Sequence, residues 1–508
     1  MKNFIYIKLL FVFIIAISIG ACKKDLGNYT YKELNKLDTI ADLPKEIIAV
    51  YGKQLKIEPK VKFTLDPNFD ESKYTYEWYY MGPNGLGGTK LHTIAKTKNL
   101  DVTTSIVAGS YSAYYAVTDK ASGVKYRTSF TLKVVNEINE GWIMMCDVNG
   151  KAQVDMLSLN TSGNFDVVHD LLKTVGSELQ LEGKPVMTYT HNTGLLIGPD
   201  AISYGLYFGT DKGTTKVDPN TFKWTPTMTL NYEMFGAIPP GFYATAMQQR
   251  GSNSAYMIGA GNVYYYNRPQ NTYFSAPLNY INAEQKAFEV EPYIAGYIFA
   301  SSTSHAIFYD KTNKRFVKHS GEASTCVTLP DPTGDAKKFS FTTGMDLVFM
   351  KWISFNGGEV FAVLKEPGGS RKFLARFNSA NLVQSYYDEI TGTEIANAEK
   401  FAFSPDLGYI FYNVGGKVYE YDMVYKTSKL MINSETKKIS YLKFYDFKST
   451  GKYTGSNKLM VGTYDTAKPE GTNGGLDIYT VPPVNGDLVL DKSYSGFGKI
   501  IDLTYRER

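Results

Sequence analysis

The sequence predicts an all-β protein in which a small immunoglobulin-like sandwich is followed by a larger β-propeller. Three observations favour this fold class. The 508 residues include 40 Tyr, 29 Phe and 45 Gly; aromatic residues suit a half-buried pleated surface, and glycine supplies the positive φ of tight turns. No long stretch has a clean 3.6-residue apolar period. Beyond residue 138, a pattern of turn, tyrosine-rich strand, turn and strand recurs along the chain.

The first 21 residues have the pattern of a cleaved signal peptide. Lys2 and Lys8 precede an apolar run that ends in small residues before Cys22, and the run is shorter than the roughly 17 to 25 residues that span a bilayer. The stretch "IGAC" resembles a bacterial lipobox, so we expect cleavage before Cys22 and lipidation of its thiol, with residues 22–39 as a tether. An ordinary secretory signal with a chance cysteine is the alternative. A multiply acylated cysteine would anchor the protein to a membrane by itself.

Charge and cysteine content limit the partners and the redox chemistry. The formal net charge of +4 falls to about +2 once the signal peptide is removed, and no basic block remains, so nucleic acid is not an expected partner. Cys146 and Cys326 lie far apart in the sequence and have no CxxC or histidine spacing of a metal site. They could form a disulfide in an oxidising compartment or remain as two buried thiols.

Residues 40–137 are predicted to form the sandwich. Roughly seven short strands separated by turn signals, with a tryptophan in the middle and a tyrosine after a glycine in a late strand, are typical of an immunoglobulin-like sandwich. Trp78 in "KYTYEWYYMG" is predicted to pack across the core. Tyr111 in "GSYSAYYAVTD" occupies the position of a tyrosine corner.

The same region carries a family resemblance. "CKKDLGNYTYKELN", "YTYEW", "GSYSAYYAVTD" and "FTLKVVNEINEGWIMM", in this order behind the lipobox, resemble the PKD-like lipoproteins encoded beside Sus-like nutrient-uptake systems of Gram-negative bacteria. The resemblance runs from Cys22 to about Asp155 and is looser beyond. It implies a PKD-like sandwich in an outer-membrane lipoprotein that works with a TonB-dependent transporter and its substrate-binding lipoprotein. It does not imply the ligand, which could be an oligosaccharide or a peptide.

Residues 138–508 are predicted to form the propeller. Seven copies of the hairpin pattern recur at intervals of about 43 to 65 residues, and radial packing of about four to eight four-stranded sheets is the usual way to bury such units. We predict seven blades. Six or eight blades, a continuous sandwich and a β-solenoid are alternatives, and the varying interval disfavours the solenoid. The copies begin at Asn149, Lys212, Gly261, Ser304, Gly369, Gly415 and Gly475.

The sequence carries no catalytic or metal-binding string. HExxH, GxSxG, GxGxxG, P-loop and EF-hand patterns are absent, and the five histidines have no ligand spacing. His169 is expected on a polar loop, and Asn149-Gly150 in a two-residue hairpin turn rather than a calcium loop. We therefore predict no catalytic residue, no metal and no cofactor. Glycosidase carboxylates lie about 5 to 9 Å apart in space but far apart in sequence, so a hydrolase or lyase stays open.

Aromatic residues on the segments between blades are the candidate ligand contacts. Flat rings stack on sugar rings or hold peptide side chains, and binding loops often gather on one rim of a rigid scaffold. Packing within a blade is the alternative role of each ring. The candidates are Trp224, Tyr232, Phe235, Tyr243, Arg250, Tyr280, Tyr293, Tyr386 and Tyr387.

The predicted function is that of an accessory substrate-binding or scaffold component of a TonB-dependent Sus-like uptake system for glycan or peptide. We expect a lipid anchor in the outer membrane, because Lys23 and Lys24 precede Asp25 in place of an acidic inner-membrane retention signal directly after the cysteine. The charged stretch "KKD" partly matches the pattern associated with export, so we expect the protein to face the cell surface. The alternatives are a propeller hydrolase or lyase acting on an extracellular polymer, and a purely structural partner of the transporter.

Overall fold

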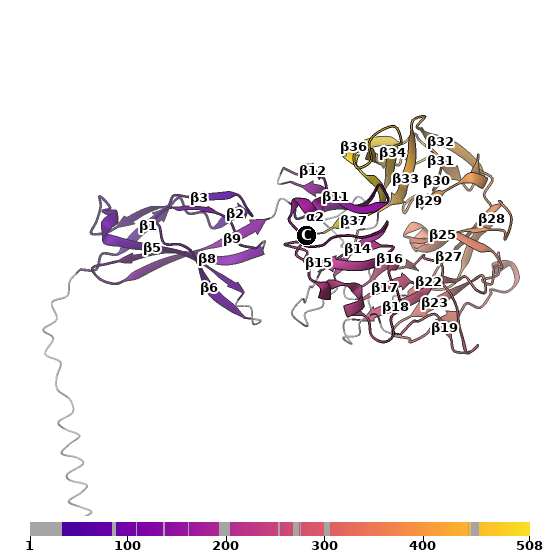
Figure 1. Cartoon of the computed structure of the whole chain (residues 1–508), viewed down its shortest axis with the longest axis horizontal. Helices are drawn as coiled ribbons and strands as arrows, with labels where there is room; N and C mark the ends of the chain where they lie inside the picture. The colour runs from indigo at the N-terminus through magenta and orange to yellow at the C-terminus, as the bar shows by residue number, and fades with distance from the viewer. Residues whose placement is uncertain are drawn as a thin grey trace, which may run out of the picture. The chain divides into compact units, whose positions relative to one another are not determined.

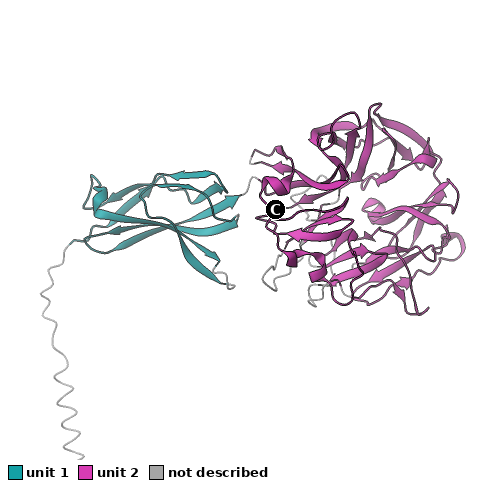
Figure 2. Ribbon diagram, viewed as in Figure 1, with its two compact units in different colours: residues 1–135 teal, residues 136–508 magenta. Residues whose placement is uncertain are grey.

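The chain divides into two compact units, residues 1–135 and 136–508 (Figure 2). In this computed structural model, Cys22 and the predicted tether up to residue 32 lie outside the described residues. Those residues are 33–83, 88–107, 109–135, 138–160, 162–192, 204–251, 254–267, 274, 276–298, 305–445, 447–448 and 457–507.

The first unit is a β-sandwich. Its elements are β1 (Leu37–Ala41), β2 (Glu46–Val50), β3 (Gln54–Ile57), β4 (Lys60–Phe63), η1 (Glu71–Lys73), β5 (Tyr74–Pro83), β6 (Thr89–Ala95), β7 (Leu100–Thr103), β8 (Gly109–Asp119) and β9 (Lys125–Val135). One sheet has the order β2-β9-β8-β5-β6, and the pairs β3-β7 and β1-β4 form two smaller sheets.

Two predictions for the sandwich are confirmed. Trp78 is fully buried, its ring centroid lies 4.3 Å from that of Tyr115, and its Nε1 donates to the carbonyl of Thr97 at 2.9 Å. Tyr111 forms a tyrosine corner, because its hydroxyl donates to the carbonyl of Val107 at 2.7 Å. A Cβ at Gly109 would lie only 3.1 Å from that hydroxyl, which explains the glycine two residues before the tyrosine.

The second unit is built almost wholly from short antiparallel strands. Its first part comprises β10 (Gly141–Val148), β11 (Lys151–Leu159), β12 (Phe165–Val168), α2 (Leu171–Thr174), β13 (Pro185–Asn192), β14 (Tyr204–Thr210), β15 (Gly213–Val217), η2 (Pro226–Met228), η3 (Leu230–Glu233), β16 (Ala244–Arg250), β17 (Ser254–Gly259), β18 (Asn262–Asn267), β19 (Tyr280–Ile281) and β20 (Lys286–Ala287).

The remaining elements complete the second unit. They are β21 (Ala295–Gly296), β22 (His305–Asp310), β23 (Arg315–Ser320), β24 (Val327–Thr328), η5 (Gly334–Ala336), β25 (Asp346–Ile353), η6 (Phe355–Gly357), β26 (Glu359–Lys365), β27 (Lys372–Phe377), β28 (Gln384–Glu389), η7 (Ile395–Asn397), β29 (Lys400–Phe403), β30 (Ile410–Val414), β31 (Lys417–Asp422), β32 (Thr427–Asn433), β33 (Lys437–Phe444), β34 (Lys458–Asp465), β35 (Gly474–Thr480), β36 (Val489–Phe497) and β37 (Lys499–Arg506).

These strands form a seven-bladed propeller. Within the described residues the blades are the sheets β37-β10-β11-β12, β13-β14-β15, β16-β17-β18, β21-β22-β23-β24, β25-β26-β27-β28, β29-β30-β31-β32 and β33-β34-β35-β36, with the pair β19-β20 as a separate hairpin. Figure 1 shows the blades following one another in chain order around a circle. The circle closes in the first blade, where β37 pairs antiparallel with β10 and sets Tyr505 opposite Trp142. The fold prediction is therefore confirmed.

Each junction between neighbouring blades has its own apolar core. In β10, Ile143 and Met145 pack against the second blade, whereas Trp142, Met144 and Cys146 pack against the seventh. A blade in the ring is covered on both faces, so its central strands are apolar at almost every position, as in "GWIMMCDV". This double burial fixes the blades rigidly around the centre.

Candidate functional site

A cavity of about 830 Å³ lies at the centre of the propeller and is called the channel below. All seven blades contribute to its lining, chiefly through their innermost strands β37, β13, β16, β21, β25 and β33, while the sixth blade contributes Pro405 and Asp406 just after β29. The aromatic lining residues are Tyr189, Tyr293, Tyr297, Phe349, Trp352, Phe444 and Tyr445, and the charged ones are Lys351, Asp406, Lys443, Lys448 and Asp502.

Hydrogen bonds between neighbouring inner strands hold the wall of the channel together. Gln248 Nε2 donates to the carbonyl of Gly296 at 2.8 Å, and the Tyr293 hydroxyl donates to the carbonyl of Val348 at 2.8 Å. Between the second and first blades, the backbone N–H of Thr188 in β13 donates to Asp502 Oδ2 in β37 at 3.1 Å. The lining side chains are therefore positioned by rigid strands rather than by loops alone.

Three lysines place ammonium groups along the wall. Lys448 Nζ donates to the Tyr445 hydroxyl at 2.7 Å and lies 4.7 Å from the centroid of the Tyr189 ring, a cation–π distance. Lys443 Nζ lies 3.5 Å from Asp502 Oδ1, and Lys351 Nζ donates to the carbonyl of Phe444 at 3.0 Å. The channel wall thus combines cationic groups with aromatic faces.

Trp352 is the largest aromatic side chain of the lining. It is half-buried, and its ring centroid lies 5.1 Å from that of Tyr297 at an angle of 55°. Gly358 fixes the other side of the indole: its φ is +103°, and a Cβ there would approach the ring to 2.6 Å. Two ring systems held in place in this way can receive a flat or amphipathic ligand.

The structure places the sequence-predicted ligand residues at several separate positions. Of the nine, Tyr293 lines the channel. Tyr232 and Phe235 are about two-thirds exposed on the segment after β15, while Trp224 donates its Nε1 to Thr215 Oγ1 at 2.8 Å and packs beside the core between the first two blades. Tyr280 donates to Gln285 Oε1 at 3.2 Å within the β19-β20 hairpin.

The remaining candidates lie in the blades or between neighbouring blades, outside the channel lining. Arg250 is buried, with its guanidinium over the Tyr265 ring and 3.4 Å from Glu322. Tyr386 donates to the carbonyl of Met423 at 3.2 Å, and Tyr387 donates to Met345 Sδ at 3.5 Å. Tyr243 is half-buried directly before β16.

Sequence reasoning did not find Trp352, Tyr297, Lys351, Lys443, Lys448 or Asp502 as channel residues. One signal was available: a lysine within the apolar stretch "LVFMKWI" of β25 is unusual for a strand packed on both faces. The same anomaly appears at Lys443 in "ISYLKF". A charged residue in such a strand indicates a face that opens onto solvent or a ligand.

The cysteines, His169 and the Asn149-Gly150 turn lie outside the channel lining. Cys146 and Cys326 are free and buried, and burial raises the pKa of the Cys326 thiol to about 12. Asn149 and Gly150 both have positive φ in a two-residue turn, and His169 is exposed, as predicted. In the part of the chain that the structure describes, no group of three His, Cys, Asp or Glu residues could hold a metal ion.

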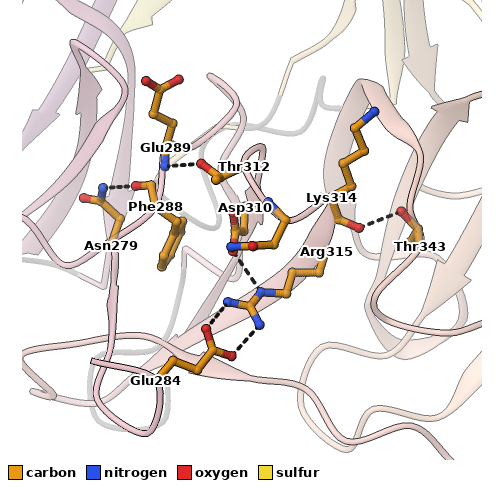
Figure 3. Close-up of polar contacts among 10 residues, drawn as sticks. Asn279, Glu284, Phe288, Glu289, Asp310, Thr312, Lys314, Arg315 and Thr343 are labelled. Carbon is orange, nitrogen blue, oxygen red and sulfur yellow. Dashed lines mark hydrogen bonds and ion pairs between the residues drawn. The ribbon is translucent and has the colours of Figure 1, made fainter. Parts of the chain in front are cut away.

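A network of polar contacts lies outside the channel, around β22, β23 and the β19-β20 hairpin (Figure 3). Arg315 donates to both carboxylate oxygens of Glu284 and to Asp310, while the backbone N–H of Glu289 donates to Thr312 Oγ1 at 3.1 Å. The Thr343 hydroxyl donates to the carbonyl of Lys314 at 3.0 Å. These donors and acceptors are hydrogen-bonded to one another. The network therefore holds the β19-β20 hairpin and the segments next to it against the fourth blade.

The fold and the channel define a two-domain all-β protein: a sandwich joined in sequence to a seven-bladed propeller with a central ligand-sized cavity. Residues 22–185 match the model of the PKD-like family, which confirms the PKD-like part of the resemblance. No curated protein matches the chain. Within the described residues, no helix has the length and apolarity needed to cross a membrane.

Several solved structures are similar to this chain at low sequence identity. A quinonprotein alcohol dehydrogenase-like protein from Bacteroides thetaiotaomicron is 10% identical over 93% of this chain and 100% of that chain, with a TM-score of 0.39. The Dos1 propeller is 10% identical over 77% of this chain and 83% of that chain, with a TM-score of 0.38. The extracellular domain of a putative one-component system from B. thetaiotaomicron is 10% identical over 86% of this chain and 57% of that chain, with a TM-score of 0.36.

Proposed function

We propose that the protein is an accessory ligand-binding lipoprotein of a TonB-dependent, Sus-like nutrient-uptake system, and that its propeller binds an oligosaccharide in the channel. The lipid on Cys22 anchors it to the outer membrane, with the two domains facing the cell surface. A transporter and its substrate-binding lipoprotein are the partners. The peptide alternative remains a measurable outcome of the experiment below.

The observation that carries the proposal is the channel itself. Ligand sites are typically concave, mostly apolar cavities of roughly 300 to 1,000 Å³ with a few well-placed polar groups. The channel, at about 830 Å³, falls in this range and combines Trp352 and Tyr297 with Gln248, Lys351 and Asp502. Inner strands from all round the ring hold its wall in place, so the side chains of the wall lose little conformational freedom when a ligand binds.

The anchoring and the uptake setting have separate support. The signal peptide and lipobox before Cys22 favour a lipid anchor. The match of residues 22–185 to the PKD-like family supports the resemblance that suggested a Sus-like system.

Calorimetry with a soluble form of the mature chain tests the proposal. The chain from residue 22, with Cys22→Ser to prevent acylation, is titrated with a panel of neutral and acidic oligosaccharides and short peptides. We expect an oligosaccharide to bind, and Trp352→Ala to weaken it at least tenfold, because a buried aromatic anchor commonly contributes about 2 kcal/mol or more. Trp352→Phe keeps a ring and should retain most of the affinity.

Tyr425→Ala is the matched control, because Tyr425 is 74% exposed on the turn between β31 and β32. It removes an aromatic ring of similar size outside the channel and should leave binding unchanged. Binding that survives Trp352→Ala intact would contradict the channel as the site. No heat with any ligand, combined with co-purification of the transporter, would favour the structural partner, and new reducing ends or new amines would favour a hydrolase or lyase.

A further inference from the structure

Two turns on the outer part of the propeller carry apolar residues at their tips. Val424 and Tyr425, in the turn between β31 and β32, are 80% and 74% exposed, and Val484, in the connection between β35 and β36, is 89% exposed. Each turn joins the third and fourth strands of its blade, whereas the channel is lined chiefly by the first strands. The tips therefore lie on the outer part of the sixth and seventh blades, apart from the channel.

One carboxylate holds the two turns together. Asp422, the last residue of β31, accepts hydrogen bonds at Oδ1 from the backbone N–H groups of Val424 at 2.7 Å and Tyr425 at 3.1 Å. Its Oδ2 accepts a hydrogen bond from Asn485 Nδ2 at 2.8 Å, and Asn485 directly follows Val484 in the chain. The apolar tips of two neighbouring blades thus form one surface, which is called the tip patch below and consists of Val424, Tyr425 and Val484.

The backbone conformation of Val484 makes a valine unfavourable at this position. The N–H of Gly486 donates to the carbonyl of Pro483 at 3.3 Å, and the two residues between them, Val484 and Asn485, have φ of +59° and +51°. This is the arrangement of a type I′ turn, which favours glycine, asparagine or aspartate at its central positions. A β-branched residue with positive φ is strained. An almost fully exposed side chain contributes little to the fold, so a strained valine here indicates a contact outside the chain.

The size and position of the tip patch fit a lipid surface better than a protein surface. Its three side chains are far fewer than the roughly 20 to 30 residues that each partner contributes to a stable protein interface. A bilayer needs no matching pocket, because apolar side chains that project from turns can enter the boundary between headgroups and acyl chains directly. Tyrosine suits this boundary, since its ring is apolar and its hydroxyl group is polar.

The charges next to the tip patch are paired within the protein. Lys426 lies 2.5 Å from Asp388, and Lys429 lies 2.7 Å from Asp487. These pairs leave the apolar side chains as the main attraction, which matches a neutral lipid surface. The lipid proposed for Cys22 would already hold the chain at a membrane, and such tethering raises the effective concentration of a second, weak contact.

We propose that the tip patch inserts into the surface of the membrane that carries the lipid anchor and thereby sets the orientation of the propeller on that membrane. Val424, Tyr425 and Val484 are the residues that enter the lipid. This inference goes beyond the proposed function and rests on it only for the anchor, because contact with lipid is measured without any ligand in the channel.

A fluorescent label at each tip tests the contact on vesicles of neutral phosphatidylcholine. The chain from residue 22, with Cys22→Ser and an N-terminal histidine tag, is held on the vesicles by a nickel-chelating lipid in place of its own acyl chains. A single new cysteine, Val484→Cys or Val424→Cys, carries a nitrobenzoxadiazole label, while the native Cys146 and Cys326 are buried. We expect the emission at both tips to shift to the blue and rise about twofold or more as the label leaves water. Salt between about 20 and 300 mM should change this little, because the contact is apolar.

Val327→Cys carries the control label, because Val327 is 55% exposed on β24, the outermost strand of the fourth blade. Its emission should not change on the vesicles.

Val484→Asn separates contact with the membrane from a structural role. Asparagine suits the type I′ turn, so the melting temperature should equal or exceed that of the original protein. The emission change of the label at position 424 should nevertheless fall about twofold or more, because one of the inserting side chains is lost. Val484→Leu keeps an apolar tip and should retain the emission change. Val327→Asn removes an exposed valine from another blade and is the matched control.

Three results would overturn the inference. The first is an unchanged emission at both tips in protein that melting curves show to be folded. The second is an equal emission change at position 327, which would indicate unspecific adsorption. The third is an emission change without vesicles that accompanies a dimer in sedimentation, which would make a second copy of the chain the occupant. Calorimetry of the channel uses no vesicles, so none of these results decides whether the channel binds an oligosaccharide.

Discussion

Arg315 holds Glu284 at two points: its Nη1 and Nη2 donate to Oε1 and Oε2 at 2.6 and 2.7 Å. Its Nε donates to the fully buried Asp310 at 2.8 Å (Figure 3). Glu284 lies in the turn between β19 and β20, a hairpin that belongs to none of the seven blades. One guanidinium therefore fastens this hairpin to β22 and β23 of the fourth blade.

Removing this guanidinium should destabilise the propeller. Arg315→Ala removes the ion pair of the buried Asp310 and keeps its hydrogen bonds from Asn313, and we expect a loss of about 2 kcal/mol in the free energy of unfolding. The free energy of unfolding of Arg315→Lys should lie between those of the original protein and Arg315→Ala, because a lysine ammonium cannot bind both carboxylate oxygens of Glu284 as the planar guanidinium does. Urea unfolding measures both. Lys426→Ala breaks an exposed ion pair and should leave the midpoint almost unchanged; equal losses in the two variants would contradict the special role of Arg315.

His191 should make the propeller sensitive to acid. The residue is 1% exposed, its ring lies 5.5 Å from that of Tyr207, and both ring nitrogens lack a hydrogen-bond partner among the described residues. Burial and, to a smaller extent, the charges of Lys448 and Lys216 together lower its pKa from 6.5 to about 3. Between about pH 6.5 and pH 3, His191 is therefore protonated in the unfolded chain but neutral in the folded chain. The free energy of unfolding decreases as the pH falls through this range.

His191→Phe tests this prediction. The variant removes the titration and the two unpaired nitrogens while keeping an aromatic ring between Tyr189 and Tyr207. We expect its melting temperature to exceed that of the original protein at pH 4.5 by more than at pH 7.5. His169→Phe, at an exposed position, should show no such pH-dependent difference. Parallel melting curves for the original protein and His191→Phe would rule the prediction out.

Glu420 should act in the opposite direction. Its carboxylate is buried between the sixth and seventh blades, and neither oxygen has a hydrogen-bond partner within the described residues. Burial raises its pKa from 4.5 to about 7, with Lys429 lowering it and Asp422 raising it. The folded chain keeps a proton that the unfolded chain releases near pH 4.5, so stability falls as the pH rises from about 4.5 to 7.

Glu420→Gln mimics the protonated form at every pH. Its melting temperature should match that of the original protein at pH 5 and exceed it at pH 8, measured by circular dichroism. Glu394→Gln is a suitable control, because hydrogen bonds from Tyr419 and Lys417 lower the pKa of Glu394. An original protein that is as stable as Glu420→Gln at pH 8 would show that Glu420 ionises without cost.

The closing strand should contribute strongly to stability. Leu503 on β37 is 2% exposed and packs in the core between the seventh and first blades. Leu503→Ala should cost about 2 to 5 kcal/mol, the usual cost of a cavity in a packed core. Leu490→Ala removes the same atoms from a side chain that is 53% exposed and should cost far less. The propeller transition in urea unfolding compares the two, and similar midpoints would contradict the closure as a stabilising contact.

The sequence predicted the blades through their middle strands. Strands such as β10, β14 and β30 are short runs of mostly apolar, buried residues followed by glycine turns, so their pattern is visible locally. The inner strands are harder to recognise. β21 has two residues and β29 four, so neither strand is long enough to show a period.

The channel could not be predicted either. Trp352, Lys443 and Asp502 belong to three inner strands that meet only when the ring closes. Aromatic residues such as Tyr232 are conspicuous on the loops, whereas Tyr293, the one predicted residue in the lining, lies on the segment directly before β21. The pairing of β37 with β10 joins strands more than 350 residues apart, and no local pattern reports such a contact.

This pairing also orders the events of folding. During synthesis an N-terminal domain generally folds first, and every strand of the sandwich has its partner within residues 37–135. The propeller cannot complete its fold as early, because β10 lacks its partner β37 until the six intervening blades have been synthesised. Until then the first blade has an unpaired edge and an uncovered apolar face, the kind of surface on which chaperones act. β37, which closes the ring, therefore determines when the propeller becomes protected from aggregation and proteolysis.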